Sequence, residues 1–181
     1  YRTLIRGNRK VKAVGEIGLD YHYEDVPREI QKAAFRAQLA LAAELDMPVI
    51  VHEREAHQDA LEILDDYPGL RGVFHCFAGS VEMARELVDM GWYLSFNGAA
   101  TFKNARKAPE VIAAVPLERL MVETDAPYMA PTPFRGKRCD SRYVYRMAET
   151  IAAIKGLTRE EVEAATTENG RKLFGIPAGE A

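Results

Sequence analysis

The sequence has few of the residues that would indicate a secreted, membrane-spanning or disordered protein. It contains only two cysteines, Cys76 and Cys139, too few for a disulfide framework or a four-thiolate zinc site. No apolar run reaches the roughly 18 residues of a membrane span, and residues 1–3 do not open a signal peptide. Hydrophobic residues make up 48% and charged residues 28%, which excludes a disordered chain. We therefore expect a cytoplasmic globular protein in a reducing compartment.

A large excess of charge of either sign is also absent, since the formal net charge is -3. This balance argues against a surface coated in positive charge for non-specific nucleic-acid binding. A local basic site is compatible with it, because net charge is a sum over the whole surface. No linker rich in glycine, proline or serine divides the chain, so we expect residues 1–181 to form a single domain.

Short apolar runs alternate with longer segments of helical periodicity. The runs are rich in β-branched and aromatic residues, and they predict buried strands over 11–19, 48–52, 72–77, 92–97 and 120–125. Between them, apolar residues at three-to-four spacing predict helices over 31–45, 56–66, 81–90 and 104–115. Ser80 is placed to cap the third helix, and Thr158 with Glu161 forms a capping box for a later one.

Strands that alternate with covering helices predict an α/β fold with a parallel sheet. The length of the repeat decides between an open doubly wound sheet and a barrel. Polar residues near the strand ends run from position 16 to position 125 in four gaps, about 27 residues each. A TIM-barrel type (β/α)₈ fold of about 250 residues needs about 31 per unit. The repeat therefore fits a barrel, of which this chain holds about five βα units.

Four of the five predicted strands carry a metal-ligating residue near the carboxyl end: Glu16, His52, His75 and Asp125. In parallel α/β proteins, active sites lie at this end of the strands. Each residue alone has an ordinary structural explanation, as a cap, a hydrogen-bonded buried histidine or a turn residue. Four at equivalent positions favour a shared divalent-metal site. The donors suit Mg²⁺, Mn²⁺ or Zn²⁺, and a metal there would acidify water for hydrolysis.

Strand parity leads to predictions for two neighbours of these candidates. Glu123 shares parity with Asp125, which predicts a group that orients Asp125 or a catalytic acid–base. Cys76 directly follows His75, and adjacent residues of a strand face opposite sides. We therefore expect Cys76 to be a small packed residue and not a nucleophile paired with His75.

Basic loops follow the last two predicted strands, TFKNARK at 101–107 and RGKR at 135–138, with Phe102 and Phe134 beside the charges. Phosphate sites of barrels often lie in the loops after the final strands. Cations beside aromatic side chains suit a nucleotide chain, and ordinary solvated surface is the alternative. The candidate phosphate-binding residues are Arg54, Lys103, Arg106, Arg135 and Lys137.

Motifs along nearly the whole chain occur in the order of those of a known family. They are GEIGLDY at 15–21, VHEREA at 51–56, HCFAGS at 75–80, SFNGAATFKNA at 95–105, ETDAPYMAP at 123–131, RGKRCDSRYV at 135–144 and TTENGRKLFGI at 166–176. On these motifs the chain resembles the TatD-related metal-dependent deoxyribonucleases. The resemblance implies a TIM-barrel hydrolase that cleaves DNA, as an exonuclease, with two divalent metal ions.

The resemblance also implies roles for the candidate residues. Glu16 would bridge both ions, His52 and His75 would complete the ligands of one ion, and Asp125 would bind the other. The family's His-x-His pair, from its first barrel strand, is absent from this sequence. We therefore expect an N-terminally incomplete member whose partners are DNA and an N-terminal fragment that completes the barrel. The catalytic candidates are Glu16, Asp125 and Glu123.

Two other functions fit the same residues. The same centre could hydrolyse another ester or amide bond, for example to remove a D-amino acid from transfer RNA. The chain could also be a non-catalytic, incomplete metal-binding remnant. A panel of DNA, nucleotide and aminoacyl ester substrates separates DNA cleavage from hydrolysis of another bond. Activity with and without the missing segment tests whether the chain is a non-catalytic remnant.

Overall fold

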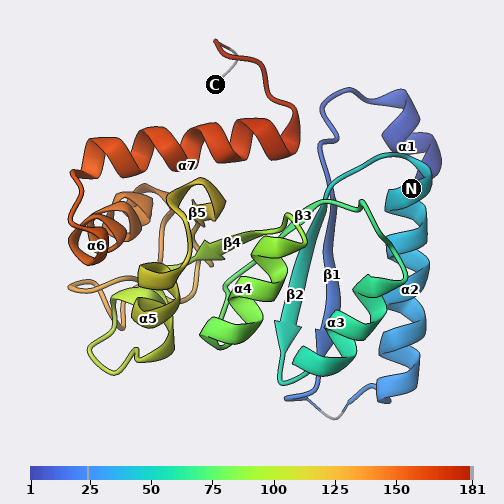
Figure 1. Cartoon of the computed structure of the whole chain (residues 1–181), viewed down its shortest axis with the longest axis horizontal. Coiled ribbons are helices and arrows are strands. Elements are labelled where there is room, and N and C mark those ends of the chain that lie inside the picture. The colour runs from blue at the N-terminus through green and yellow to red at the C-terminus, as the bar shows by residue number, and fades with distance from the viewer. Residues whose placement is uncertain (24, 180–181) are drawn as a thin grey trace. The chain divides into compact units, whose positions relative to one another are not determined.

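The computed structural model describes residues 1–23 and 25–179. The chain forms two compact units. Figure 1 shows the chain coloured by residue number, so their segments can be found from the colour bar. Unit 1 consists of Tyr1–His75 together with Leu173–Ala181, and unit 2 consists of Cys76–Lys172. Within the part of the chain that the structure describes, no helix has the length and apolar content needed to cross a membrane.

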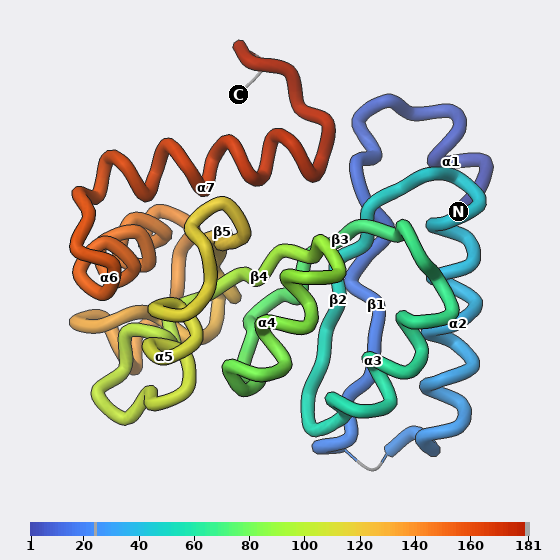
Figure 2. Tube along the Cα trace, in the orientation of Figure 1, coloured from blue at the N-terminus to red at the C-terminus, as the bar shows by residue number. Residues whose placement is uncertain are grey.

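Unit 1 is a run of parallel strands with helices between them. Its elements are α1 (Arg2–Gly7), β1 (Val14–Asp20), α2 (Arg28–Glu44), β2 (Val49–Arg54), α3 (His57–Asp65) and β3 (Gly72–Phe74). β1 pairs with β2 and β2 with β3, all parallel. α2 packs on β1 and α3 on β2, as the trace in Figure 2 shows.

The core of unit 1 explains why these segments fold as they do. Val49 and Val51 alternate along β2 and are fully buried, as are Phe35 and Leu39 on one face of α2. Branched side chains pack well on a pleated strand, while apolar residues four apart lie on the same side of a helix. The buried faces meet between strand and helix, so the ends of the strands are held in fixed register.

Unit 2 repeats the strand–helix order with shorter strands. Its elements are α4 (Val81–Asp89), β4 (Tyr93–Phe96), η1 (Gly98–Thr101), α5 (Lys107–Ala114), η2 (Leu117–Arg119), β5 (Leu120–Val122), η3 (Ser141–Val144) and α6 (Tyr145–Lys155), followed by α7 (Arg159–Phe174), whose last residues belong to unit 1. β4 and β5 are parallel. Asn169 of α7 donates from Nδ2 to the Leu117 and Leu120 carbonyls, at 2.9 and 2.8 Å, which holds the helix against the start of β5.

The five strands occupy the segments predicted from the sequence, but their ends differ. β3 ends at Phe74 and β5 at Val122, so the residues after them lie in loops. Residues 98–101 form a 3₁₀ turn, and α5 therefore begins at Lys107 rather than at 104. The predicted Ser80 cap is confirmed, since its side chain accepts a hydrogen bond from the Met83 N–H at 3.3 Å.

Candidate metal centre and the Asp125 loop

Three of the predicted ligands converge in unit 1. Glu16 lies on β1, His52 on β2, and His75 directly after β3. Each offers a ligand atom within 4.8 Å of the other two. One carboxylate oxygen, Glu16 Oε1, lies 2.9 Å from His52 Nδ1 and 3.2 Å from His75 Nε2. The three neighbouring parallel strands therefore bring two imidazole nitrogens and a carboxylate to one point.

His52 lies between two carboxylates. Its Nδ1 faces Glu16 and its Nε2 lies 2.9 Å from Asp20 Oδ2. A neutral imidazole carries one N–H, so it can donate to only one of two carboxylates. When Asp20 takes that hydrogen bond, the Nδ1 lone pair faces a carboxylate oxygen. A divalent cation held by both atoms would replace this repulsion by attraction to each of them, and the donor set therefore fits a metal.

Asp20 is a candidate site residue that the sequence prediction missed. Burial opposes its ionisation, but hydrogen bonds from His52 and from the His22 backbone N–H outweigh burial and hold the pKa of Asp20 below its ordinary value. Gln31 fixes the Asp20 backbone through bonds of 2.8 and 2.9 Å. The period of two along β1 was the available signal, because Glu16, Gly18 and Asp20 are alternate residues.

Gly18 sets the spacing between β1 and β2 at this site. It pairs in register with His52, and its φ is +144°. A Cβ at this position would lie 1.9 Å from the His52 carbonyl oxygen, which is backbone and cannot rotate away. The glycine therefore permits the close approach that brings His52 to Glu16.

Asp125, the fourth predicted ligand, lies in unit 2 in the loop after β5. Its Oδ2 accepts a hydrogen bond from Asn97 Nδ2 at 3.1 Å. The same amide contacts Cys76 Sγ at 2.8 Å, and its Oδ1 accepts from the Ala99 N–H at 2.9 Å. Asn97 is 2% exposed, so it is a buried polar anchor for Asp125. The convergence of Asp125 with the other three ligands stays a prediction.

The loop that carries Asp125 rests on a second close contact with a glycine. A Cβ on Gly98 would lie 1.9 Å from the Met129 carbonyl oxygen and 2.9 Å from the Pro131 nitrogen. The 126–131 loop therefore packs directly on the backbone that follows β4. Only glycine allows this approach. In the sequence NG at 97–98, Asn97 therefore supplies the amide that contacts Asp125, and Gly98 supplies the space for the loop.

Glu123 has a clear structural contact. Its Oε1 accepts a hydrogen bond from the Cys76 backbone N–H at 2.6 Å, and its own N–H donates to the Phe96 carbonyl at 3.1 Å. Cys76 has a φ of +48°, a conformation that non-glycine residues seldom adopt. Glu123 therefore holds the turn after β3. A role as acid–base group stays a prediction.

The expectation that Cys76 is a small packed residue stays a prediction, but its basis in strand parity is wrong. The strand parity behind it ends with β3 at Phe74, and the positive φ redirects the chain at Cys76. Its side chain is half-buried and lines a cavity of unit 2 together with Asn97. The sequence alone gave no signal of the turn.

The predicted phosphate-binding residues lie in both units and are exposed. In unit 1, the Arg54 guanidinium lies 5.4 Å from the centre of the Tyr23 ring. In unit 2, the Arg135 guanidinium lies 4.3 Å from the centre of Phe102. Phe134 instead stacks on Tyr143, with ring centres 4.3 Å apart, so one of its faces is already covered. The remaining candidates are Lys103, Arg106 and Lys137.

These observations define a class of protein. Parallel strands alternate with helices, and two imidazoles and a carboxylate gather at one point, as in TIM-barrel-type metal-dependent hydrolases, although Glu16 is the third residue of β1 and not at its carboxyl end. A solved structure of this kind, the YJJV TatD homologue from Escherichia coli K12, matches with a TM-score of 0.89 at 35% identity, covering 97% of this chain and 68% of that one.

Residues 3–175 match the family described as TatD related DNase, and the chain belongs to that family. It is 48% identical over 174 residues, 95% of its length, to the uncharacterized metal-dependent hydrolase YabD of Bacillus subtilis, of which it covers 68%. It is 38% identical, over 92% of its length, to the 3'-5' ssDNA/RNA exonuclease TatD of Klebsiella pneumoniae, covering 66% of that protein. The chain thus spans about two thirds of the length of its curated relatives.

Proposed function

We propose that the protein is a metal-dependent phosphodiesterase that cleaves DNA, acting as an exonuclease on single strands. The observation that carries the proposal is Glu16 Oε1, which faces a nitrogen of His52 and a nitrogen of His75 at 2.9 and 3.2 Å. A carboxylate shared by two imidazoles in this way is suited to bridging metal ions. The exonuclease name of the Klebsiella relative supports the substrate class.

The residues of this chain would divide the work as follows. The site would hold two divalent ions. Glu16 would be a ligand of both, His52 and His75 would be ligands of one, and Asp125 would be a ligand of the other. The ions would supply an activated water and neutralise charge on the phosphate. Asp20 would keep His52 in the tautomer that presents Nδ1 to the site. Glu123 would act through the turn at Cys76 that it fixes.

The phosphate contacts in this proposal come from the exposed cations. Arg54 on unit 1, and the basic loops of unit 2, would bind the sugar–phosphate backbone without reading sequence. Phosphate contacts position a strand, whereas the metal ligands act on the scissile bond. Loss of a phosphate contact should therefore weaken strand binding, whereas loss of a metal ligand should lower the rate of hydrolysis.

The test is hydrolysis of a labelled single strand by the chain after chelation and addition of Mg²⁺, Mn²⁺ or Zn²⁺, with and without an added N-terminal fragment. Glu16→Ala should nearly abolish turnover and cost more than His52→Ala, because a bridging ligand serves both ions. Lys10→Ala, an exposed cation outside the site, is the control. Near-normal hydrolysis by Glu16→Ala in metal-buffered solution would overturn the proposal.

The same assay separates the other functions. Cleavage of aminoacyl esters but not of DNA would indicate a deacylase that uses this centre. Metal binding by calorimetry without turnover on any substrate, even after the fragment is added, would indicate a non-catalytic remnant. Each result assigns the site to one chemistry.

A further inference from the structure

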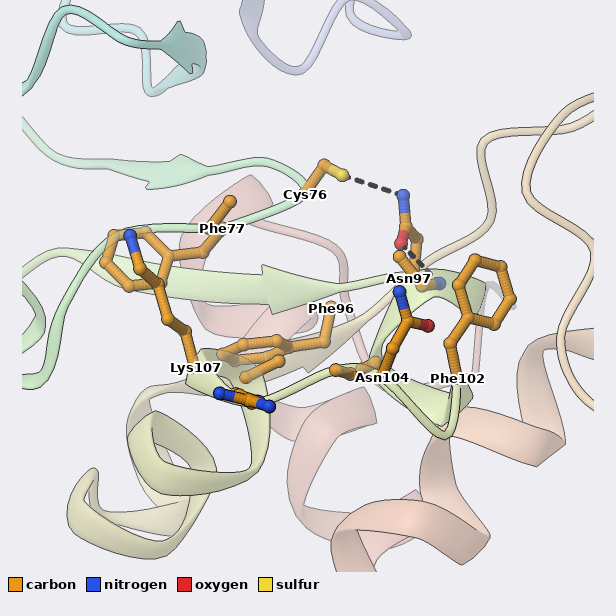
Figure 3. A pocket seen from close by; sticks show the side chains of 13 residues that line it. Cys76, Phe77, Phe96, Asn97, Phe102, Asn104 and Lys107 are labelled. Carbon is orange, nitrogen blue, oxygen red and sulfur yellow. Dashed lines mark hydrogen bonds between the residues drawn. The ribbon is translucent and has the colours of Figure 1, made fainter.

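Unit 2 contains a cavity that the metal centre does not use. It offers about 400 Å³ of space, within the range of about 300–1,000 Å³ found for small-molecule sites. Three phenylalanines line it, Phe77, Phe96 and Phe102. Figure 3 shows Phe77 and Phe102 on opposite sides, with Phe96 between them. Three aromatic rings around one cavity make it suited to a flat, apolar group.

The Phe102 wall is held in place before any ligand arrives. Thr101 Oγ1 donates to the Gly98 carbonyl at 2.7 Å and accepts from the Thr132 N–H at 2.8 Å. Thr132 Oγ1 donates to the Thr101 carbonyl at 3.1 Å. Arg135, which lies over the Phe102 ring, is outside the set of residues that line the cavity. A wall fixed in this way loses little entropy when it binds a ligand.

The rim of the cavity is polar and positively charged. Asn104, Arg106 and Lys107 line it and are exposed, so an amide and two cations stand where the cavity meets solvent. Figure 3 shows Asn104 beside Phe102, and Lys107 on the side of Phe77. This order of charges and rings matches a nucleotide, whose phosphate is anionic and whose base is flat.

The cavity also adjoins the Asp125 loop. Asn97 lines the cavity, and its amide donates to Asp125 Oδ2 at 3.1 Å. A group bound here would therefore lie next to a residue that the proposed function places in the catalytic machinery.

We propose that this cavity binds one base of a single-stranded nucleic acid. The base stacks on Phe102, its edge meets the Asn104 amide, and the adjoining phosphates meet Arg106 and Lys107. The inference rests on the proposed function and adds to it a binding site for one nucleotide of the strand. An alkyl group would fill the cavity without needing the amide or the cations, so the rim favours a base.

The experiment compares two strands of equal length and charge, oligothymidylate and a strand whose sugars carry no bases. Both are titrated onto the full chain by fluorescence anisotropy at several salt concentrations, with Ca²⁺ in place of the metals that support turnover. The normal strand should bind more tightly. Phe102→Ala should weaken it by about 5- to 100-fold, should leave the base-free strand unchanged, and should keep the slope of affinity against salt.

Matched variants separate stacking from other effects. Phe102→Trp keeps an aromatic face and should bind the normal strand as well as the wild type does. Tyr1→Ala removes an aromatic side chain that is 87% exposed in unit 1, and it should change neither strand's binding. Arg106→Gln removes a cation and should weaken both strands and reduce the salt slope. Asn104→Ala should reduce the preference among thymine, adenine and cytosine strands.

A second measurement locates the base directly. Irradiation of a bound strand that contains 4-thiothymidine should cross-link it to a peptide within residues 96–108. Equal binding of normal and base-free strands, or cross-links only outside the cavity, would overturn the base site and leave the proposed function standing. A chain that binds neither strand would overturn both.

Discussion

The candidate metal centre depends on residues whose importance lies in what they do to a neighbour. Asp20 is not one of the three groups that converge, yet it fixes the His52 ring through a 2.9 Å contact at Nε2. Partners of this kind orient a metal-binding histidine and select its tautomer. The centre is therefore a set of four side chains, of which three would touch a metal.

At this scale we predict the effect of Asp20→Asn. The amide can still contact His52 but cannot act as an anionic acceptor, so Zn²⁺ or Mn²⁺ affinity should fall by about 10- to 100-fold. Isothermal titration calorimetry of the full chain measures this fall. Asp65→Asn, an exposed carboxylate at the end of α3 and outside the cavity that Glu16, Asp20 and His52 line, is the matched control. Unchanged affinity in Asp20→Asn would show that His52 needs no such partner.

A second prediction at the residue scale concerns pH. The Thr158 backbone N–H donates to Glu161 Oε2 at 2.8 Å, and the hydroxyl does so at 2.8 Å, which together hold the pKa of Glu161 below its ordinary value. The ionised form therefore stabilises the start of α7. This stabilisation is present above the carboxyl's ordinary pKa and is lost as the pH falls through the lowered one.

Carbon NMR of the Glu161 carboxyl against pH measures that titration. Thr158→Ala removes the hydroxyl and keeps the backbone N–H, so the midpoint should rise only part of the way toward the ordinary value. Glu161→Gln should remove the acid-dependent fraying of α7 that amide exchange detects. A midpoint identical in wild type and Thr158→Ala would mean that the hydroxyl contributes nothing.

Among the elements, the register of β1 against β2 decides whether Glu16 and His52 meet. We predict that Gly18→Ala forces the strands apart, because its Cβ would lie 1.9 Å from the His52 carbonyl oxygen. Unfolding of unit 1 should become easier by more than about 1 kcal/mol, and metal affinity should fall with it. Thermal unfolding and calorimetry measure the two effects.

Gly69→Ala is the control for this change. Gly69 also has a positive φ, +85°, but no atom lies within 4 Å of its added Cβ. It therefore carries the backbone strain without the clash, and should leave metal affinity intact. Equal loss of metal binding in both variants would show that strand spacing is not the cause.

The basic loops of unit 2 lead to a prediction about salt. Replacing Arg106, Arg135 and Lys137 by alanine should weaken every DNA sequence equally, because phosphate contacts carry no base information. The slope of log affinity against log salt should flatten by about 2 for a single strand, at about 0.7 per phosphate contact. Binding at several salt concentrations measures it. A triple variant that keeps the wild-type slope would show that these loops do not contact phosphates.

Element by element, the sequence predicted most of the fold. Periodicity found the five strands because each is a short run of branched and aromatic residues, and Ser80 marked the start of α4. The sequence prediction failed at the positions where the chain leaves a strand. The turn at Cys76 depends on a distant acceptor, Glu123 Oε1, and no local pattern records a contact between residues 47 apart.

The residues of the site were likewise predicted where a local pattern exists and missed where a distant contact decides. Glu16, His52 and His75 were found because neighbouring parallel strands bring residues at similar places along them together. Asp20 was missed because its importance lies in a contact with a ring on another strand. The cavity beside Asn97 was missed because it is formed by several segments, and the sequence gives the spacing of its phenylalanines but not their convergence.

On the scale of the whole molecule, unit 1 exposes apolar groups beside a strand edge. Leu4 is 64% exposed, Ile30 59% and Val26 46%, and a cavity of about 220 Å³ adjoins Val14 and Gly15 of β1. Among the described residues β1 pairs with β2 alone, and apolar groups beside a free strand edge favour association. We propose that a further strand, such as one with the His-x-His pair, pairs here.

We therefore predict that the chain of residues 1–181 associates when expressed alone. Light scattering after size exclusion should show oligomers, and a dye that binds apolar surface should fluoresce. Both signals should fall when a fragment with a His-x-His strand is added, and nuclease activity should rise. A cooperatively melting monomer with full activity in the isolated chain would contradict this prediction.

The last residues of the chain return to its first half. Lys12 Nζ donates to the Gly175 carbonyl at 3.2 Å, and Leu173–Ala181 belong to unit 1. During synthesis, unit 1 therefore receives its closing segment only after all of unit 2 has left the ribosome. Glu16, His52 and His75 are therefore made before this segment of their own unit. A stop codon after Lys172 would thus remove nothing from unit 2 and would take its last segment, Leu173–Ala181, from unit 1.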